Sequence, residues 1–479
     1  MYLVFQLFYG AICTLELDPL AGCISPRLIG TSGVIPLTII STIPDIMRYY
    51  YHIIVHAQKE ILFATCWWEK GDTASIICNA LRDLSKRAAQ EKRHVIVKLL
   101  IDRFTKHNLV HAHAILPSEH WEHCNIPKAD ELPFVLLEVN TSHRLIVGAS
   151  HSKFLIVDRK IALLNSNNIY DRPNLEMMIH YEGDVVNSFY DIFLISWQIP
   201  FNPRLVCLQE ESLASRDFHF FTKNALVLED DNAQSTAVLA KTTTEIVSNL
   251  TGLQATPHLQ SPLTARLNQF ARSDSTADSN LNFQQLQNLS ADFSPYIFHT
   301  AHQPFPIAFV NRTAHGKPGH TDKNNPQNAA WLGAFQYAQK SIFIQTPNFN
   351  ATLAIDGVLA ACRRGIKVTL WLDLGYNDRK EGHSTFQGGT NEHVVKKLCK
   401  ELKDNDDEAV RKNLEIFWYT AKDQTHPRHF SEHKRNCHVK FMAIDDQVAI
   451  MGSGNMDTQS WLHSEVRNID SYTYLYILI

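Results

Sequence analysis

Two short segments of the sequence repeat a histidine, a lysine and an aspartate at the same spacing. They consist of His151, Lys153 and Asp158, and of His438, Lys440 and Asp445. Alternate side chains of a strand share a face, so the histidine and lysine of each segment point to the same side. Imidazoles can act as nucleophiles or as general acids and bases, while ammonium groups can bind an anion. The segments together predict one site where these groups act on an anionic substrate.

A polar run follows each segment, at residues 165–168 and 452–455. These runs supply neutral hydrogen-bond donors close to the histidines, and such donors can stabilise the charge that develops on a phosphate. The candidate phosphate- or substrate-binding residues are Ser166, Asn168, Ser453 and Asn455.

Both segments belong to a longer internal repeat that must position them. Residues 56–65 reappear as residues 337–346, and each copy predicts the end of a helix followed by a buried strand. A helix and a second strand follow in each copy, at 73–91 and 94–102, then at 352–364 and 366–373. This order predicts an α/β fold of two tandem units related by a pseudo-twofold axis, each a mixed sheet flanked by helices. His151 and His438 would then meet across the cleft between the units.

The repeat also predicts the organisation of the whole chain. We expect a first unit over residues 28–200, a linker or insertion over 201–300 and a second unit over 301–479. From about residue 231 the linker is dominated by Ser, Thr, Asn, Gln and Ala, a composition typical of flexible segments. A helix at 184–197 closes the first unit. The second ends in an apolar tail at 472–479, so we expect it to be C-terminally shortened, with one sheet face uncovered.

The duplicated pattern, H-x-K-x4-D-x6-[G/N]-S-x-N, resembles the two HKD motifs of the phospholipase D superfamily. The second copy is closely similar to the family pattern, whereas the first has Asn165 where the family often has glycine. The pieces Asn174-Leu-Glu176 and Ser464-Glu465 also look like those of the family. Residues 387–391 resemble a loop of related eukaryotic members, so the nearest likeness is to eukaryotic phospholipase D-like and cardiolipin-synthase-like proteins.

The resemblance implies a two-step reaction through a phosphohistidine, without a metal or another cofactor. The family usually uses the N-terminal histidine as nucleophile, here His151, although the sequence leaves the order of the two histidines open. Glu176 and Glu465 are candidates to orient the histidine of the opposite half. Asp158 and Asp445 belong to the catalytic motif, and we expect them to anchor it structurally rather than to contact the phosphate.

Three functions fit such a site. The first is a phospholipase D-type enzyme that hydrolyses phospholipids to phosphatidic acid, or transfers the phosphatidyl group to an alcohol as cardiolipin synthases do. The second is a metal-independent nuclease, which the balance of 45 Lys and Arg against 49 Asp and Glu disfavours. The third is an inactive lipid-binding scaffold, which the intact histidines and lysines disfavour. With both half-sites in one chain, we expect a functional monomer that acts on a phospholipid or other phosphodiester and does not need nucleic acid.

The remaining features bear on location. Nine cysteines are scattered without CxxC spacing, which indicates a reducing compartment rather than a disulfide framework. The apolar residues 1–13 are too short to cross a bilayer, and no basic residue precedes Arg27. We therefore expect an intracellular protein, cytoplasmic or peripherally bound to a membrane. The His-rich basic run at 426–435 predicts a loop that contacts phosphate or a lipid head group.

Overall fold

The computed structural model describes residues 2–102, 112–143, 148–209, 218–220, 295–314, 320–376, 389–421, 424, 426–431, 435–463 and 467–472. The side chains of Tyr2 and of residues 467–472 are excluded from this description. The predicted low-complexity stretch, from about residue 231 to 292, lies outside the described residues. So do residues 473–479 of the apolar tail.

The strands of the two halves follow one another in the same pattern along the chain. The first half contains β1 (Gly30–Thr42), β2 (Glu60–Thr65), β3 (Val95–Asp102), β4 (His113–Ile115), β5 (Val135–Ser142), β6 (Phe154–Val157), β7 (Ile161–Asn165) and β8 (Leu175–Glu182). The second half contains β9 (Tyr296–Phe298), β10 (Phe305–Asn311), β11 (Ser341–Thr346), β12 (Lys367–Leu372), β13 (Leu414–Trp418), β14 (Phe441–Ile444), β15 (Val448–Gly452) and β16 (Arg467–Tyr472).

Helices connect the parallel strands and cover the sheets. They are α1 (Tyr2–Leu17), α2 (Ile43–Val55), α3 (Asp72–Gln90), α4 (Val185–Trp197), α8 (Pro326–Tyr337), α9 (Thr352–Arg363), α10 (Asn391–Asn405), α11 (Glu408–Arg411) and α12 (Thr458–Leu462), with short 3-10 helices at Pro26–Leu28, Ser118–Cys124 and Ala129–Glu131. The helices and strands predicted at 73–102, 184–197 and 352–373 all form, with ends shifted by one residue. The mixed α/β fold is therefore confirmed.

The two halves repeat one strand order. Strands run β5-β3-β2-β6-β7-β8 in the first half and β13-β12-β11-β14-β15-β16 in the second. In both, the first three strands are parallel and the next three antiparallel. This is the two-unit arrangement that the sequence repeat predicts, although the exact unit limits stay a prediction.

Strand β1 joins the two sheets into one. Its first residues, Gly30–Gly33, pair with β10, and its later residues pair with β8 from Val34 to Thr42. Gly33 lies where the partner changes, and a Cβ there would lie 2.7 Å from the carbonyl oxygen of Glu182. The close approach of the two backbones explains the glycine.

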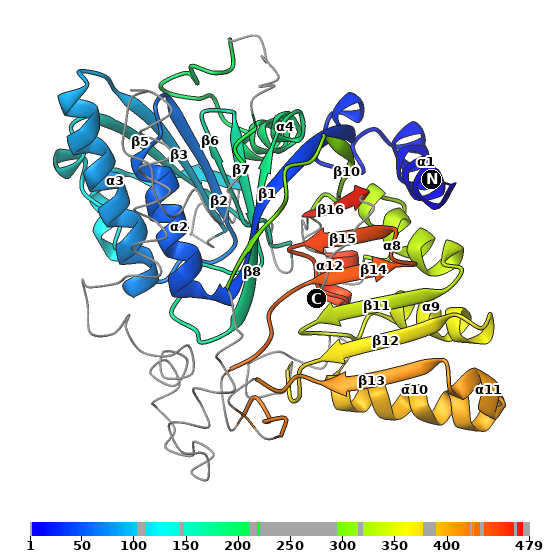
Figure 1. Cartoon of the computed structure of the whole chain (residues 1–479). Helices are drawn as coiled ribbons and strands as arrows, with labels where there is room; N and C mark the ends of the chain where they lie inside the picture. Colours follow the sequence, from blue (N-terminus) through cyan, green and yellow to red (C-terminus); the bar gives the residue numbers. More distant parts are fainter. Residues whose placement is uncertain are drawn as a thin grey trace.

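Three apolar clusters fill the space between the helices and strands that Figure 1 draws. Helices α2 and α3 bury one face of the first half, and α8, α9 and α10 bury the corresponding face of the second. Helix α4 packs between the halves, where Phe189 and Phe193 share a cluster with Phe309 and Met451. The central layer thus belongs to both units.

Helix α1 is the element whose place the sequence did not predict. Its residues Leu3, Leu7, Ala11 and Leu15 are buried in the same cluster as Trp331 of α8. The N-terminal helix therefore completes the core of the second half, while Phe5 and Tyr9 on its other face are exposed. Among the described residues, no helix combines the length and apolar character needed to cross a bilayer.

Candidate active site

The aspartates of the two motifs lie in equivalent hairpin turns. Asp158 follows β6 and Asp445 follows β14, both with φ near +50°, a left-handed conformation that Asp tolerates better than most residues. The carboxylate of Asp158 accepts the backbone N–H groups of Gln58, Lys59 and Glu60 at 2.6–3.0 Å. Asp445 accepts those of Gln339, Lys340 and Ser341 at 2.7–2.9 Å.

These turns lie at the far end of the motif strands from the histidines. Each motif strand has four residues, which span roughly 13 Å. The geometry is therefore that of a structural anchor for the motif strand. Neither Asp158 nor Asp445 lies close to the histidine of its own motif.

A backbone link between the halves positions the second histidine. Leu175, the first residue of β8, forms a parallel bridge with Cys437. The N–H of Leu175 donates to the carbonyl of Asn436, and the N–H of His438 donates to the carbonyl of Leu175, both at 2.8 Å. The residue after Leu175 is therefore held beside the second motif.

Glu176 meets His438 across this link. Both carboxylate oxygens lie 3.0 Å from Nδ1 of His438, and the two side chains are 0% and 6% exposed. Burial lowers the pKa of His438 to about 4, although Glu176 opposes this shift. Burial raises the pKa of Glu176, but His438, Lys440 and Ser166 outweigh it, and the net shift is downward. At neutral pH the pair is thus a carboxylate that accepts from Nδ1–H of a neutral imidazole, which leaves Nε2 with a lone pair.

His151 approaches the second half in a reciprocal way. It hydrogen-bonds to the backbone of Ser453. Burial lowers its pKa well below the usual value, and the positive charges of Lys153, Lys440 and His438 add to that effect. The two histidines and two lysines therefore lie near enough for their charges to interact.

The lysines are buried and held in the same way. Lys153 Nζ donates to the carbonyl of His151 at 3.0 Å, and Lys440 Nζ to the carbonyl of His438 at 2.5 Å. Burial lowers the pKa of both, and that of Lys440 falls to about 7. A bound anion would offset much of the free-energy cost of burying the two charged ammonium groups, because it favours their charged form.

The four predicted phosphate-binding residues with neutral side chains differ in the contacts that they make. Ser166 Oγ donates to Glu176 at 2.5 Å, so its proton serves the carboxylate. Asn455 Nδ2 donates to Asp457 at 3.1 Å, and Asn168 hydrogen-bonds to Tyr170. Ser453 is fully buried beside His151. Among these four predicted phosphate ligands, the described contacts of Ser166, Asn168 and Asn455 are structural.

Other predicted residues lie outside the described part of the chain, namely Ser464, Glu465, residues 387–388, and His433 and Lys434 of the basic run. His429 contacts Glu392 at 3.5 Å and Ser431 at 2.7 Å.

In the part of the chain that the structure describes, no group of three His, Cys, Asp or Glu side chains is arranged to hold a metal ion.

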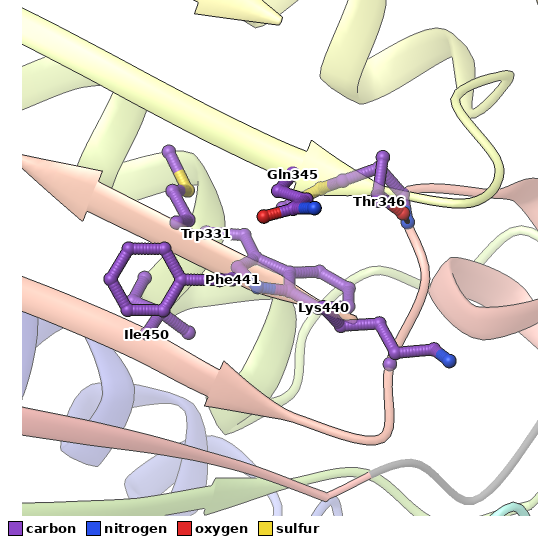
Figure 2. Close-up of a pocket in the computed structure, with 9 residues that line it drawn as sticks. Trp331, Gln345, Thr346, Lys440, Phe441 and Ile450 are labelled. Carbon is purple, nitrogen blue, oxygen red and sulfur yellow. Dashed lines mark hydrogen bonds between the residues drawn. The ribbon is translucent and has the colours of Figure 1, made fainter. Parts of the chain in front are cut away.

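Two cavities border the motifs. Lys440 lies at a pocket of about 10 Å³, the size of one water, with Gln345, Thr346 and Trp331 (Figure 2). A cavity of about 340 Å³ reaches Ser150, the residue before His151. Its volume is within the range of small-molecule sites.

Sequence reasoning missed three residues that contact the motif segments. Asp102 accepts the N–H of Ser150, Asp373 accepts the N–H of Cys437, and the ring of Tyr376 lies 6.3 Å from that of His438. The aspartates were visible in the repeat, since each ends the second strand of its copy. Nothing in the spacing indicated the tyrosine.

Comparisons with known proteins match part of the chain by sequence and most of it by fold. Residues 332–472, which include the second motif, match the family model described as "Cardiolipin synthase, PLD-like domain". A sequence search of curated proteins gives no match.

Among solved structures, phosphatidylserine synthase from Haemophilus influenzae Rd KW20 is similar at a TM-score of 0.51 and 12% identity, over 94% of this chain and 86% of that one. NucT from Helicobacter pylori has a TM-score of 0.22 and 15% identity, over 30% of this chain and 76% of that one. Nuc from Salmonella typhimurium has a TM-score of 0.23 and 12% identity, over 35% and 84%. The likeness to the synthase spans most of both chains, and at 12% identity it concerns the fold.

Proposed function

We propose that this chain is a member of the phospholipase D superfamily, and that it is a phosphodiesterase or phosphatidyltransferase that acts on phospholipids through a phosphohistidine. It would yield phosphatidic acid with water, or a new phosphatidyl ester with an alcohol. The family model of the second half, with its cardiolipin synthase description, supports a lipid substrate.

One observation carries the proposal. Glu176 of one half pairs with His438 of the other, beside two buried lysines from the two halves. A buried carboxylate on Nδ1 sets the tautomer in which Nε2 can attack phosphorus or accept a proton. A site built across the halves needs both motifs, which explains why both are intact.

The proposed reaction has two displacements. Nε2 of one histidine attacks phosphorus while the bond to the leaving alcohol breaks. The second histidine, whose protonated form is stabilised by the bound phosphate anion, gives that alcohol its proton. The second histidine then takes a proton from water or an acceptor alcohol. The new oxygen attacks phosphorus, and the phosphorus–nitrogen bond breaks. Lys153 and Lys440 hold the non-bridging oxygens throughout.

Two observations bear on which of the two histidines is the nucleophile. His151 is the nucleophile by resemblance, whereas the described carboxylate partner belongs to His438. The cavity at Ser150 offers room for a head group or acceptor close to His151. A nuclease is the alternative, since the same pair of histidines acts on any phosphodiester that enters.

The test offers purified protein phospholipid vesicles with a primary alcohol, and separately a labelled single-stranded oligonucleotide, both with EDTA. His151→Ala and His438→Ala are compared with His120→Ala, which changes an exposed histidine of the first half. We expect phosphatidic acid or the phosphatidyl alcohol from wild type and His120→Ala, and at least a 1,000-fold loss in the two motif variants. Oligonucleotide cleavage alone would favour the nuclease. Near wild-type turnover in either motif variant would refute the paired-histidine reaction.

A further inference from the structure

Two aspartates outside the motifs occupy equivalent places in the two halves. Asp102 is the last residue of β3, and Asp373 directly follows β12. These strands are parallel neighbours of β2 and β11, so both carboxylates lie at the edge of the sheet where the parallel strands end. The side chain of Asp102 is 8% exposed, and Asp373 is 2% exposed.

Each carboxylate binds the backbone immediately before a motif histidine. Asp102 Oδ2 accepts the N–H of Ser150, which precedes His151. Asp373 Oδ1 accepts the N–H of Cys437 at 3.1 Å, which precedes His438. Sheet pairing does not create these bonds, because β6 and β14 begin only after the motif lysines. Bonds to a carboxylate are stronger than bonds between neutral groups, and a buried N–H without an acceptor is costly.

We propose that Asp102 and Asp373 are positioning residues, which hold the start of each histidine–lysine segment against its sheet so that the two imidazoles face the same phosphate. The inference rests on the proposed function, since it concerns the presentation of His151 and His438. Neither aspartate is proposed to touch the substrate.

The electrostatics of the first half fit this role. Asp102 Oδ1 also accepts from Nδ1 of His143 at 2.8 Å, so the carboxylate is held from two sides. Burial lowers the pKa of Lys153, and the negative charge of Asp102 is among the groups that oppose this. The same carboxylate thus fixes the backbone and favours the charged lysine.

The test compares Asp373→Ala and Asp102→Ala with the isosteric Asp373→Asn and Asp102→Asn, which keep one acceptor oxygen. His143→Ala is a matched control that removes a second contact of Asp102 and leaves the Ser150 bond in place. In the alanine variants we expect amide exchange at Cys437 or Ser150 to accelerate, and the NMR signal of the adjacent histidine ring to move.

We also expect kcat to fall about 100-fold, because small displacements of reacting groups have effects of this size, while KM changes little. The asparagine variants should recover most of kcat and of the amide protection.

The exchange and ring measurements need no substrate, so they separate this inference from the proposed function. Unchanged exchange and ring signals in the alanine variants would overturn the positioning role, even if the enzyme were active. Altered signals with an unchanged kcat per folded molecule would overturn it as well. If wild type cleaved no phosphodiester, the proposed function would fail, while altered ring signals rescued by asparagine would still support the positioning. Should an alanine variant not fold, amide exchange in the wild-type protein decides. Slow exchange at Ser150 and Cys437 would support the positioning role, and rapid exchange there would overturn it.

Discussion

At the scale of single residues, the contact between Glu176 and His438 occupies Nδ1 of the imidazole and leaves Nε2 with a lone pair. The carboxylate accepts from Nδ1 and is fully buried. The negative charge of Glu176 raises the pKa of His438 and so opposes the effect of burial. Glu176→Gln would remove this charge, and the neutral glutamine would no longer stabilise a protonated imidazole. We expect kcat to fall by about 10²–10⁴ with little change in KM, the usual contribution of acid–base catalysis.

The control for this prediction is Glu182→Gln, which changes another buried glutamate of β8 that contacts His180 and His219. This variant should lose stability and keep its kcat. Equal losses of kcat in both variants would mean that Glu176 acts on the strand and not on the imidazole.

The pKa of Lys440 predicts a pH dependence of substrate capture. Burial lowers this pKa to about 7, so the free protein loses the Lys440 charge as the pH rises through 7. A bound phosphate favours the ammonium form, so kcat/KM should fall above pH 7 while kcat does not. In Lys440→Arg the guanidinium stays charged, and the fall near pH 7 should disappear. A fall that persists unchanged in this variant would assign the titration to another group, and a direct NMR titration of Lys440 checks the same point.

At the scale of elements, the hairpin turns fasten the motif strands to their sheets. Asp445 holds three N–H groups at the start of β11 and has a positive φ. Asp445→Ala should lower the free energy of unfolding by about 2–4 kcal/mol, because three partly buried backbone N–H groups lose their charged acceptor. The folded fraction should keep its kcat.

Asp446 provides a matched control, since it is exposed and has the same φ of 55°. Asp446→Ala repeats the backbone strain without removing the three contacts. Denaturant titration of both variants therefore isolates the carboxylate. A large loss of kcat in folded Asp445→Ala would favour a direct catalytic role for this residue.

Individual helices and strands could be predicted from the sequence more completely than the contacts between them. The apolar runs that became β2, β3, β11 and β12 are short, bounded and duplicated, so local pattern and repeat agreed. The pairing of β1 with both sheets was not visible. A strand sequence does not reveal which neighbours its two halves will have.

At the scale of the whole molecule, the N-terminal helix ties the start of the chain to the core of the second half. Leu7 is fully buried against α8, whereas Phe5 on the same helix is 62% exposed. Leu7→Ala should lower the free energy of unfolding by about 2–4 kcal/mol, since it leaves a cavity in that core. Phe5→Ala should change it by less than about 1 kcal/mol.

The same two variants, Leu7→Ala and Phe5→Ala, distinguish the packing of α1 against the core from a contact of α1 with a membrane. If the exposed face of α1 meets lipid, Phe5→Ala will weaken sedimentation with phospholipid vesicles, while Leu7→Ala at a temperature where it is folded will not. Hydrogen exchange of α8 in the two variants reports the packing directly. Faster exchange in Phe5→Ala than in Leu7→Ala would contradict the orientation of the helix.

The sequence by itself determined the duplication, the α/β character of both units and the four residues His151, Lys153, His438 and Lys440 as candidates. Spacing and strand periodicity are local properties, and a repeat doubles the evidence for each of them. Only the tertiary structure decided that Glu176 meets His438, that Ser166 serves this glutamate, and that Asp102 and Asp373 bind the backbone before the histidines. These contacts join residues far apart in the chain, and they follow from how β8 docks on the second motif and where parallel strands end. Hydrophobic patterning sets which face of an element is buried, but the partners of a buried polar group depend on packing between elements.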